Sequence, residues 1–368
     1  MPNGERILIV GAGIAGMATA IALSQNGFRP ELIEKSPEHR TSGTGLALFG
    51  NATRVLAQLG VDAAGARLHG WRFLDTRGAV LCQTDLDALW SGVGECVGVE
   101  RGCLMAALRD AVRSVPIRTG VTVASVTQLL DEVHVAFSDC SEGTYDLVVG
   151  ADGIYSSVRS ILDGGAPLYA GQMVWRCIVD GSFVDNNSVV LGDGRFVGLV
   201  PVGRGRTYAF FGQVSPHQFK DPVQGRLSRL RERFCHFGSA VPAFLAALHC
   251  DEQLRFDAIE WVEADCWTSG RVVLVGDAAH ASPPHMGQGA AMALEDAVVL
   301  AECLSCTSVS QALGTYVARR QPRTTWVQQQ SLSALAAWLL PAAVRDAALQ
   351  ARGDEILQQR YAPLRAPA

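Results

Sequence analysis

The sequence predicts an α/β protein in which a domain built on a parallel sheet is interleaved with a mixed or antiparallel β-sheet domain, and C-terminal helices follow. The parallel sheet is indicated by short apolar runs at Arg6–Val10 and Arg271–Val275, each ending at a glycine turn before a helical segment. The second sheet is indicated by Gln172–Val179 and two later segments, where apolar and polar residues alternate as in antiparallel strands.

Composition narrows the class of protein. The 368 residues suggest two or three domains at roughly 100–200 residues each. With 48% hydrophobic and 18% charged residues, the chain can bury a large core and is not intrinsically disordered. The net charge is −5 and the basic residues are scattered, so we expect neither nucleic acid nor an anionic membrane surface as a partner.

The uncharged run from Ile7 to Phe28 imitates a signal peptide or membrane anchor. Glycines and polar residues interrupt it, so we expect a strand and a helix there, no targeting segment and no membrane span.

The ten cysteines form no recognisable framework. The Cys303–Cys306 pair has no second pair to complete a zinc site, so we expect no metal. Buried free thiols in a reducing cytoplasm are the better interpretation.

The remaining elements follow from periodicity and turn residues. The first helix begins near Ile14 and ends at Gly27, which suits a C-terminal cap. The other expected helices are Ala52–Leu59, Gly102–Val115, Gly225–Leu248, Gly289–Leu304 and a tail at Trp326–Gln350 broken at Pro341. The other expected strands are Pro30–Glu34, Leu68–Leu74, Ala79–Cys82, Val121–Val126, Val133–Phe137, Asp146–Val149, Arg195–Val202 and Thr207–Gln213.

These elements divide the chain into three parts. Residues 1–67, 101–165 and 268–325 form the α/β domain, residues 68–100 and 166–267 form the β-sheet domain, and residues 326–368 form a helical tail.

The first chemically informative segment is Gly11-Ala12-Gly13-Ile14-Ala15-Gly16, a G-x-G-x-x-G between a strand and a helix. The glycines allow a tight turn and close backbone approach to a pyrophosphate, and the helix N-terminus attracts its charge. Glu34 ends the next strand, where an acid binds an adenosine ribose hydroxyl and disfavours the 2′-phosphate of NADP. The segment therefore predicts a dinucleotide site; a merely tight strand–helix turn is the alternative.

Two further segments end strands with an acid. Asp152 follows the strand Asp146–Val149 and precedes a serine-started helix, and here a capped β-turn-α is as good an explanation as a functional one. Asp277 follows Arg271–Val275, and Gly287 and Gly289 bracket the start of a long helix. This third segment is the most specific signal, because backbone N–H groups and a helix dipole would point at a ligand there.

In this order and spacing, the three segments resemble the single-component (class A) FAD-dependent aromatic hydroxylases, the group of p-hydroxybenzoate, salicylate and urate hydroxylases. The resemblance covers the chain to about residue 325, without the extra C-terminal thioredoxin-like domain of longer relatives. It implies a Rossmann-like FAD domain and bound FAD, with NAD(P)H as reductant. The cofactor-binding residues that it implies are Gly11, Gly13, Ala15, Gly16, Glu34, Lys35, Arg40, Gly45, Leu46, Arg101, Asp152, Asp277, Gly287, Gly289 and Ala290.

The resemblance also implies the reaction: a monooxygenase that uses NAD(P)H and O2 to hydroxylate a small aromatic or heteroaromatic molecule through a flavin C4a-hydroperoxide. We expect Tyr208 and His285 to be catalytic, with Tyr208 matching a substrate-contacting tyrosine of urate hydroxylase. Where that enzyme has a substrate-binding arginine, this chain has Phe196 with Arg195 beside it, which argues against urate. Trp175 and Arg176 alternate on one strand, so only one can face the pocket.

Other readings remain open. A halogenase or an isoprenoid reductase would share the cofactor domain, although the W-x-W-x-I-P signature of flavin halogenases is absent from the sequence. A non-catalytic flavin-binding protein is the third possibility. We expect the protein to act as a monomer or homodimer.

Overall fold

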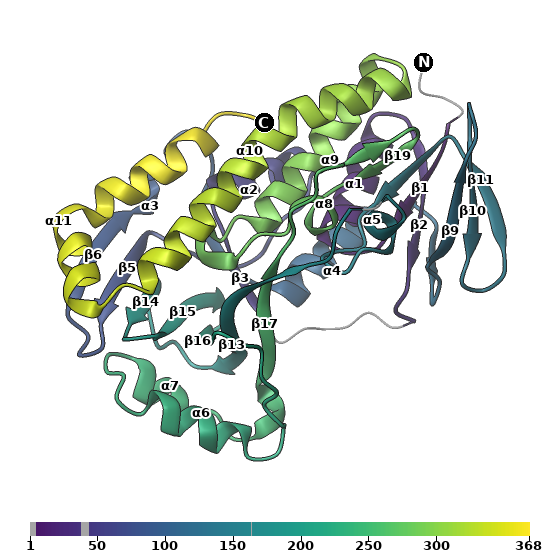
Figure 1. The fold of residues 1–368 in the computed structure, drawn as a ribbon. Helices are drawn as coiled ribbons and strands as arrows, with labels where there is room; N and C mark the ends of the chain where they lie inside the picture. Colours follow the sequence, from purple (N-terminus) through teal and green to yellow (C-terminus); the bar gives the residue numbers. More distant parts are fainter. Residues whose placement is uncertain (1–4, 38–43, 163) are drawn as a thin grey trace.

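The protein is described by a computed structural model that covers residues 5–37, 44–162 and 164–368. Its organising element is a six-stranded sheet with β1 (Arg6–Val10) near the centre (Figure 1). β1 pairs in parallel with β2 (Arg29–Glu34) and with β12 (Leu147–Gly150). The outer strands are β8 (Ile117–Thr119), β19 (Val272–Leu274) and the antiparallel edge strand β18 (Thr268–Ser269).

Because β1, β2, β12 and β19 are parallel, their carboxyl ends lie at one edge of the sheet. The three segments singled out in the sequence follow β1, β12 and β19, so the topology brings them together from positions far apart in the chain.

Helices pack around this sheet and connect its strands. α1 (Ile14–Gln25) contacts α9 (Gly289–Cys306), and α10 (Val309–Trp338) lies along α9 (Figure 1). The other helices of this region are α2 (Gly50–Gln58), α4 (Arg101–Ala111), α5 (Ser157–Ile161), α8 (Asp277–His280) and the 3-10 turn η2 (Pro284–Met286).

The second large sheet has seven strands in the order β17-β13-β16-β15-β14-β5-β6. All neighbours are antiparallel except β14 and β5, so the sheet is mixed as predicted. Its strands are β5 (Gly70–Asp75), β6 (Val80–Asp85), β13 (Leu168–Asp180), β14 (Asn187–Leu191), β15 (Arg195–Gly203), β16 (Arg206–Val214) and β17 (Arg255–Trp261).

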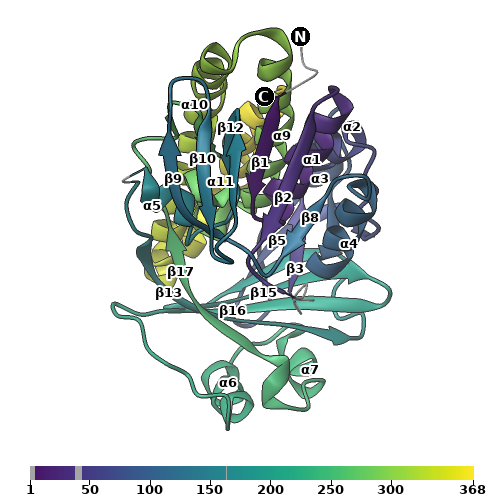
Figure 2. The same cartoon turned by 90° about the vertical axis from the view of Figure 1, so that its right-hand side faces the viewer.

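The two faces of this sheet have different neighbours. α6 (Arg226–Phe234) and α7 (Val241–Ala246) cover the face that points away from the parallel sheet (Figures 1 and 2). Trp175 and Phe211 pack there against Phe234 in a separate hydrophobic core. The opposite face is left to line a cavity beside the parallel sheet.

Smaller elements complete the fold. One three-stranded sheet consists of β3 (Gly45–Leu48), β7 (Val97–Glu100) and β4 (Ala66–Arg67), and another of β9 (Val123–Gln128), β10 (Val133–Phe137) and β11 (Glu142–Tyr145). The short helix α3 (Leu86–Leu89), the C-terminal helix α11 (Ala342–Tyr361) and the turns η1 (Asp251–Gln253) and η3 (Ala362–Leu364) account for the rest.

Three expectations need correction. The helix expected at Gly225–Leu248 is two helices, because Ser239 adopts a positive φ of 57° that a right-handed helix does not allow. α10 begins at Val309 and continues through Pro322, so the helix expected from Trp326 is much longer than predicted. The ten cysteines are free, but five are exposed and only Cys96, Cys177 and Cys303 are buried. The prediction that the thiols are buried was therefore wrong for most of them.

Over the described residues, every helix is too short or too polar to cross a bilayer.

Candidate active site

A cavity of about 490 Å³ lies between the carboxyl edge of the parallel sheet and the open face of the seven-stranded sheet. The glycine turn after β1, the β3 strand and the α8–α9 segment form one side of it. Side chains from β13, β14, β15, β16 and β17 form the other. The predicted cofactor segments and the predicted catalytic residues thus meet in one place.

The glycines after β1 have two different tasks. A Cβ at Gly16 would lie 1.8 Å from the carbonyl oxygen of Gly11, and one at Gly11 would lie 2.5 Å from that of Ala151, so both are needed for packing. A Cβ at Gly13 would meet no protein atom within 4 Å, because Gly13 faces the cavity. Glu34 accepts a hydrogen bond from the Ala12 N–H at 2.9 Å, which places its carboxylate at this turn.

The third segment is anchored from behind. Asp296, on α9, accepts hydrogen bonds from the backbone N–H of Gly276 at 2.8 Å and from His280 at 2.6 Å. Its other oxygen accepts from Arg320 of α10 at 2.7 Å, and all three side chains are buried. His280 therefore has a structural partner, while the neighbouring Asp277 is exposed and lines the cavity with Gly287, Gly289 and Ala290.

The second segment is a cap. The Asp152 carboxylate accepts hydrogen bonds from both serines at the start of α5 and from the Ser157 N–H at 2.7 Å. Its neighbours Ala151 and Gly153 line the cavity, but Asp152 does not. The structural alternative considered for this acid explains its position.

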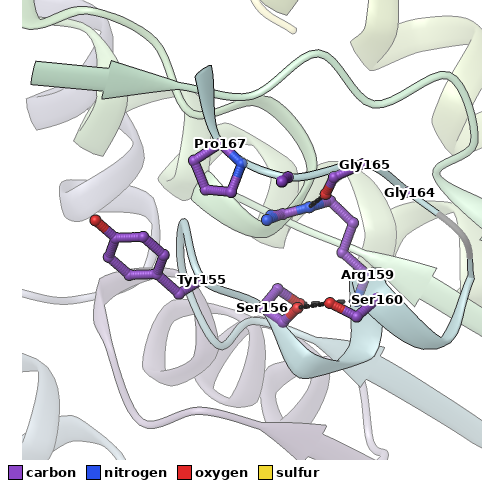
Figure 3. A pocket seen from close by; sticks show the side chains of 8 residues that line it. Tyr155, Ser156, Arg159, Ser160, Gly164, Gly165 and Pro167 are labelled. Carbon is purple, nitrogen blue, oxygen red and sulfur yellow. Dashed lines mark hydrogen bonds between the residues drawn. The ribbon is translucent and has the colours of Figure 1, made fainter. Parts of the chain in front are cut away.

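A shallower pocket beside α5 is formed by Tyr155, Arg159 and the backbone around Gly165 (Figure 3). Arg159 donates to the carbonyl oxygens of Ile154, Gly165 and Ala278 at 2.6–3.1 Å. Its guanidinium is thus occupied by the backbone, and it fixes this segment to α8.

The remaining predicted cofactor residues are divided. Ala15, Gly45, Leu46 and Arg101 line the cavity, and the Arg101 N–H donates to the Thr44 carbonyl oxygen at 2.9 Å. Lys35 is exposed after β2 and does not line the cavity. Arg40 lies outside the described residues.

This side of the cavity fits FAD. Gly13 leaves the open space that a pyrophosphate needs, and the N-terminus of α9 provides a positive dipole end. Among the described residues, nothing donates a hydrogen bond to the Asp277 side chain, so this acceptor is available to a ribityl hydroxyl.

The opposite side carries an aromatic wall, which we define as Trp71, Phe196, Tyr208, Phe210 and Trp338. Trp338 lies 4.9 Å from Phe196, Phe196 lies 6.2 Å from Phe210, and Phe210 lies 5.9 Å from Tyr208, between ring centroids. This wall matches the flat apolar surface of an aromatic ring.

Two of its rings lie over glycines of the neighbouring strand. Phe196 pairs with Gly212, and Phe210 pairs with Gly198. A Cβ at either glycine would come within 1.9 Å of the ring above it.

Both predicted catalytic side chains line the cavity. Tyr208 is 7% exposed, and burial raises the pKa of its hydroxyl to about 12, so it is a neutral donor. His285 is 6% exposed, and burial lowers its pKa to about 3, so its ring is neutral as well. Neither His285 nitrogen has a hydrogen-bond partner within the described part of the chain.

The structure resolves the one choice left open by the sequence and also shows how Phe196 and Arg195 are oriented. Arg176 lines the cavity, whereas Trp175 points to the other face and donates to Asp221 at 2.7 Å. Phe196 lines the cavity, whereas Arg195 donates to the Arg233 carbonyl oxygen of α6 at 2.9 Å. The position expected to face the substrate is therefore apolar.

Among the lining residues that sequence reasoning missed are Trp71, Asn187 and Trp338. Strand alternation could have placed Asn187 on the same face as Val189, but only once the register of the sheet was known. Trp338 belongs to the end of α10, in a tail to which the sequence assigned no part of the site.

Comparison with known proteins agrees with this geometry. The protein family described as an FAD binding domain matches residues 5–331. Aurachin C monooxygenase/isomerase of Stigmatella aurantiaca is 34% identical over 333 residues, covering 88% of this chain and 87% of that protein. The 2-heptyl-3-hydroxy-4(1H)-quinolone synthase of Pseudomonas aeruginosa is 32% identical over 334 residues, with 88% and 87% covered.

A similar solved structure is Klebsiella pneumoniae HpxO complexed with FAD and uric acid. It is 26% identical, covers 99% of this chain and 97% of its own, and superposes with a TM-score of 0.91.

Proposed function

Since the chain belongs to the FAD-binding family of flavin-dependent aromatic hydroxylases and is an FAD-dependent monooxygenase, we propose that it hydroxylates a small aromatic or heteroaromatic molecule with NAD(P)H and O2. The observation that supports this most is the cavity itself, where dinucleotide-binding loops face the aromatic wall. We propose that residues 1–67, 101–165 and 268–325 hold the cofactor, and that residues 68–100 and 166–267 supply most of the substrate side.

FAD, when bound, accepts hydride from NAD(P)H and activates O2. The chain's part is to bind and orient it without a covalent bond. Backbone N–H groups around Gly13 would receive the pyrophosphate, Glu34 would accept from the adenosine ribose, and Asp277 would accept from the ribityl chain. The N-terminus of α9, at Gly289, favours negative charge at the ring.

The substrate ring lies against the aromatic wall, which excludes water. The Tyr208 hydroxyl donates a hydrogen bond to it, and the neutral His285 ring offers an acceptor for a substrate O–H or N–H. Polarising that group makes the ring more electron-rich where it reacts. Because protonation of buried His285 is unfavourable, it acts as a hydrogen-bond acceptor rather than as a cation.

We also propose a cytoplasmic location, because ten free cysteines suit a reducing compartment.

The test is to purify the protein with FAD and follow NAD(P)H oxidation across an aromatic library under isotope-labelled dioxygen. The expected result is ligand-stimulated oxidation and a product carrying one labelled oxygen atom. Halide incorporation, or reduction of a double bond without oxygen, would indicate the halogenase or reductase instead. Absence of any ligand-dependent oxidation would favour a binding protein.

A further inference from the structure

Two polar side chains line the end of the cavity beside β5 and β14, and each has a hydrogen-bonding atom without a partner among the described residues. Trp71 and Asn187 are register partners on these two parallel strands, and both side chains line the cavity. They are 5% and 4% exposed, yet Trp71 Nε1 and Asn187 Oδ1 have no hydrogen-bond partner among the described residues. Buried polar groups are nearly always paired, so an unpaired donor and an unpaired acceptor on two neighbouring side chains that line a cavity point to a ligand.

His285 lines the same cavity and is linked to Trp71 through ring contacts. Its ring lies 4.8 Å from Trp338, which contacts Phe73 at 6.0 Å, and Phe73 contacts Trp71 at 5.3 Å. The unpaired nitrogens of His285 therefore add a second uncharged hydrogen-bonding position to this aromatic surface.

The charged lining residues lie away from the Trp71–Asn187 end, although one of them, Arg176, is the register partner of Phe210 in the aromatic wall. Arg176 and Arg255 are register partners on β13 and β17, and Arg176 pairs with Asp257 at 3.3 Å. In the sheet order, β13 is three strands from β14, which at ~4.8 Å per strand is about 14 Å. The other lining charges, Arg101 and Asp277, belong to the cofactor side.

An aromatic carboxylate needs a cation, commonly an arginine that binds both oxygens. At the Trp71–Asn187 end the lining offers uncharged donors, acceptors and rings, and burying a carboxylate among them is strongly unfavourable. Phe196 adds to this, because it lines the cavity while Arg195 points away to α6.

We propose, on the premise of the hydroxylase function above, that the substrate is an uncharged heteroaromatic ring with a donor and an acceptor on its edge, held by Asn187 and Trp71, and not an aromatic carboxylate. Asn187 Oδ1 accepts from a ring N–H or O–H, and Trp71 Nε1 donates to a carbonyl oxygen or ring nitrogen.

The first test measures binding to the oxidised holoenzyme by flavin fluorescence, so that turnover is not needed. The probes are matched pairs: 4-quinolone with its 2-carboxylate, and phenol with salicylate. At least one uncharged parent ring should bind, with a Kd at least tenfold lower than that of its carboxylate. Equal or tighter binding of the carboxylates, or no binding of either parent ring, would overturn the proposal.

The second test uses Asn187→Leu, which replaces the amide by an apolar group of similar size, and Trp71→Phe, which removes the indole N–H and keeps an aromatic ring. Each should raise the Kd of the bound parent ring about tenfold and leave FAD content unchanged. Ser188→Ala is the control, because this neighbour on β14 donates to the Asn186 carbonyl oxygen and does not line the cavity.

Unchanged binding in the folded variants would refute the proposal. Loss of FAD would refute it as well, because it would show that Trp71 and Asn187 bind the cofactor rather than the substrate. If Asn187→Leu does not fold, Trp71→Phe decides alone. A parent ring that binds but is not oxygenated would refute the hydroxylase function and leave the binding proposal standing. Oxygenation of carboxylates alone would refute the binding proposal and support the hydroxylase function.

Discussion

His280 and Asp296 form a hydrogen-bonded pair in the interior, with 2.6 Å between Nε2 and Oδ2, and neither side chain is more than 3% exposed. Burial alone would raise the pKa of Asp296, but His280 and Arg320 together hold it below its usual range. Because the same carboxylate receives the Gly276 N–H, the loop that presents Asp277 to the cavity depends on α10. The cofactor site is thus supported by a residue of a helix that does not itself belong to the three nucleotide segments.

Arg320→Ala tests this support. The substitution leaves the buried Asp296 with one cation fewer, and removing one partner of a buried ion pair destabilises a protein by about 3–5 kcal/mol. Urea denaturation measures the loss. Arg319→Ala is the matched control, because its ion pair with Glu302 is partly exposed and contributes about 1 kcal/mol or less. Equal stability of the two variants would contradict the role given to Arg320.

Gly13→Ala and Gly16→Ala should have different consequences. The methyl group at Gly13 enters open cavity space, so the apoprotein should keep its stability and lose FAD affinity. The methyl group at Gly16 meets the Gly11 carbonyl oxygen, so the protein itself should lose stability, by about 1–3 kcal/mol for overpacking. Thermal unfolding without FAD and flavin titration separate the two effects. The reverse pattern would show that Gly13 does not face the pyrophosphate.

Asp277→Ala should weaken FAD binding and leave the fold intact, because Asp277 is exposed to the cavity and the anchor of its loop is Asp296. Loss of one acceptor for a ribityl hydroxyl corresponds to about 1–3 kcal/mol. Flavin released by heat denaturation and titration of the apoprotein measure the affinity. Asp265→Ala, an exposed acid away from the cavity, serves as control. If Asp277→Ala binds FAD with wild-type affinity, the Asp277 carboxylate does not contribute to FAD binding.

Tyr208→Phe should leave FAD content unchanged and lower product formation more than tenfold, or about 1.4 kcal/mol of barrier. The neutral hydroxyl is lost while the ring that packs on Gly45 remains. NAD(P)H oxidation should continue with more hydrogen peroxide and less product per reductant. If the ratio of peroxide to product does not change, Tyr208 is only a packing residue.

The buried His285 predicts a pH effect on stability. Its pKa is lowered from 6.5 to about 3 by burial, so between these values the unfolded chain binds a proton that the folded chain does not. This contribution to stability is complete above pH 6.5 and is lost as the pH falls, by about 1.4 kcal/mol per pH unit. His285→Phe lacks the titrating ring. In urea denaturation from pH 7 to 4, the wild type should therefore lose stability relative to His285→Phe as the pH falls, and parallel curves would contradict the assignment.

Prediction from sequence succeeded where local pattern determines geometry. A strand, a glycine turn and a helix are close in the chain, so the segments at Gly13 and Asp277 could be recognised, and parallel strands then bring them together. Asp152 shows the limit of such motifs, since the same pattern suits a helix cap. Trp71 and Asn187 could not be paired, because the parallel register of β5 and β14 joins segments more than a hundred residues apart. Trp338 was missed because tertiary packing, not periodicity, brings the end of α10 to the cavity.

The positions of the Phe196 and Phe210 rings make the shape of the cavity depend on residues that do not line it. Both rings lie over glycines, at Gly212 and Gly198, which are not among the residues that line the cavity. A single added methyl group at either glycine would displace the ring above it and so change the shape of the cavity. Substrate range can thus narrow or widen through residues beneath the rings, while every side chain that touches the substrate keeps its identity.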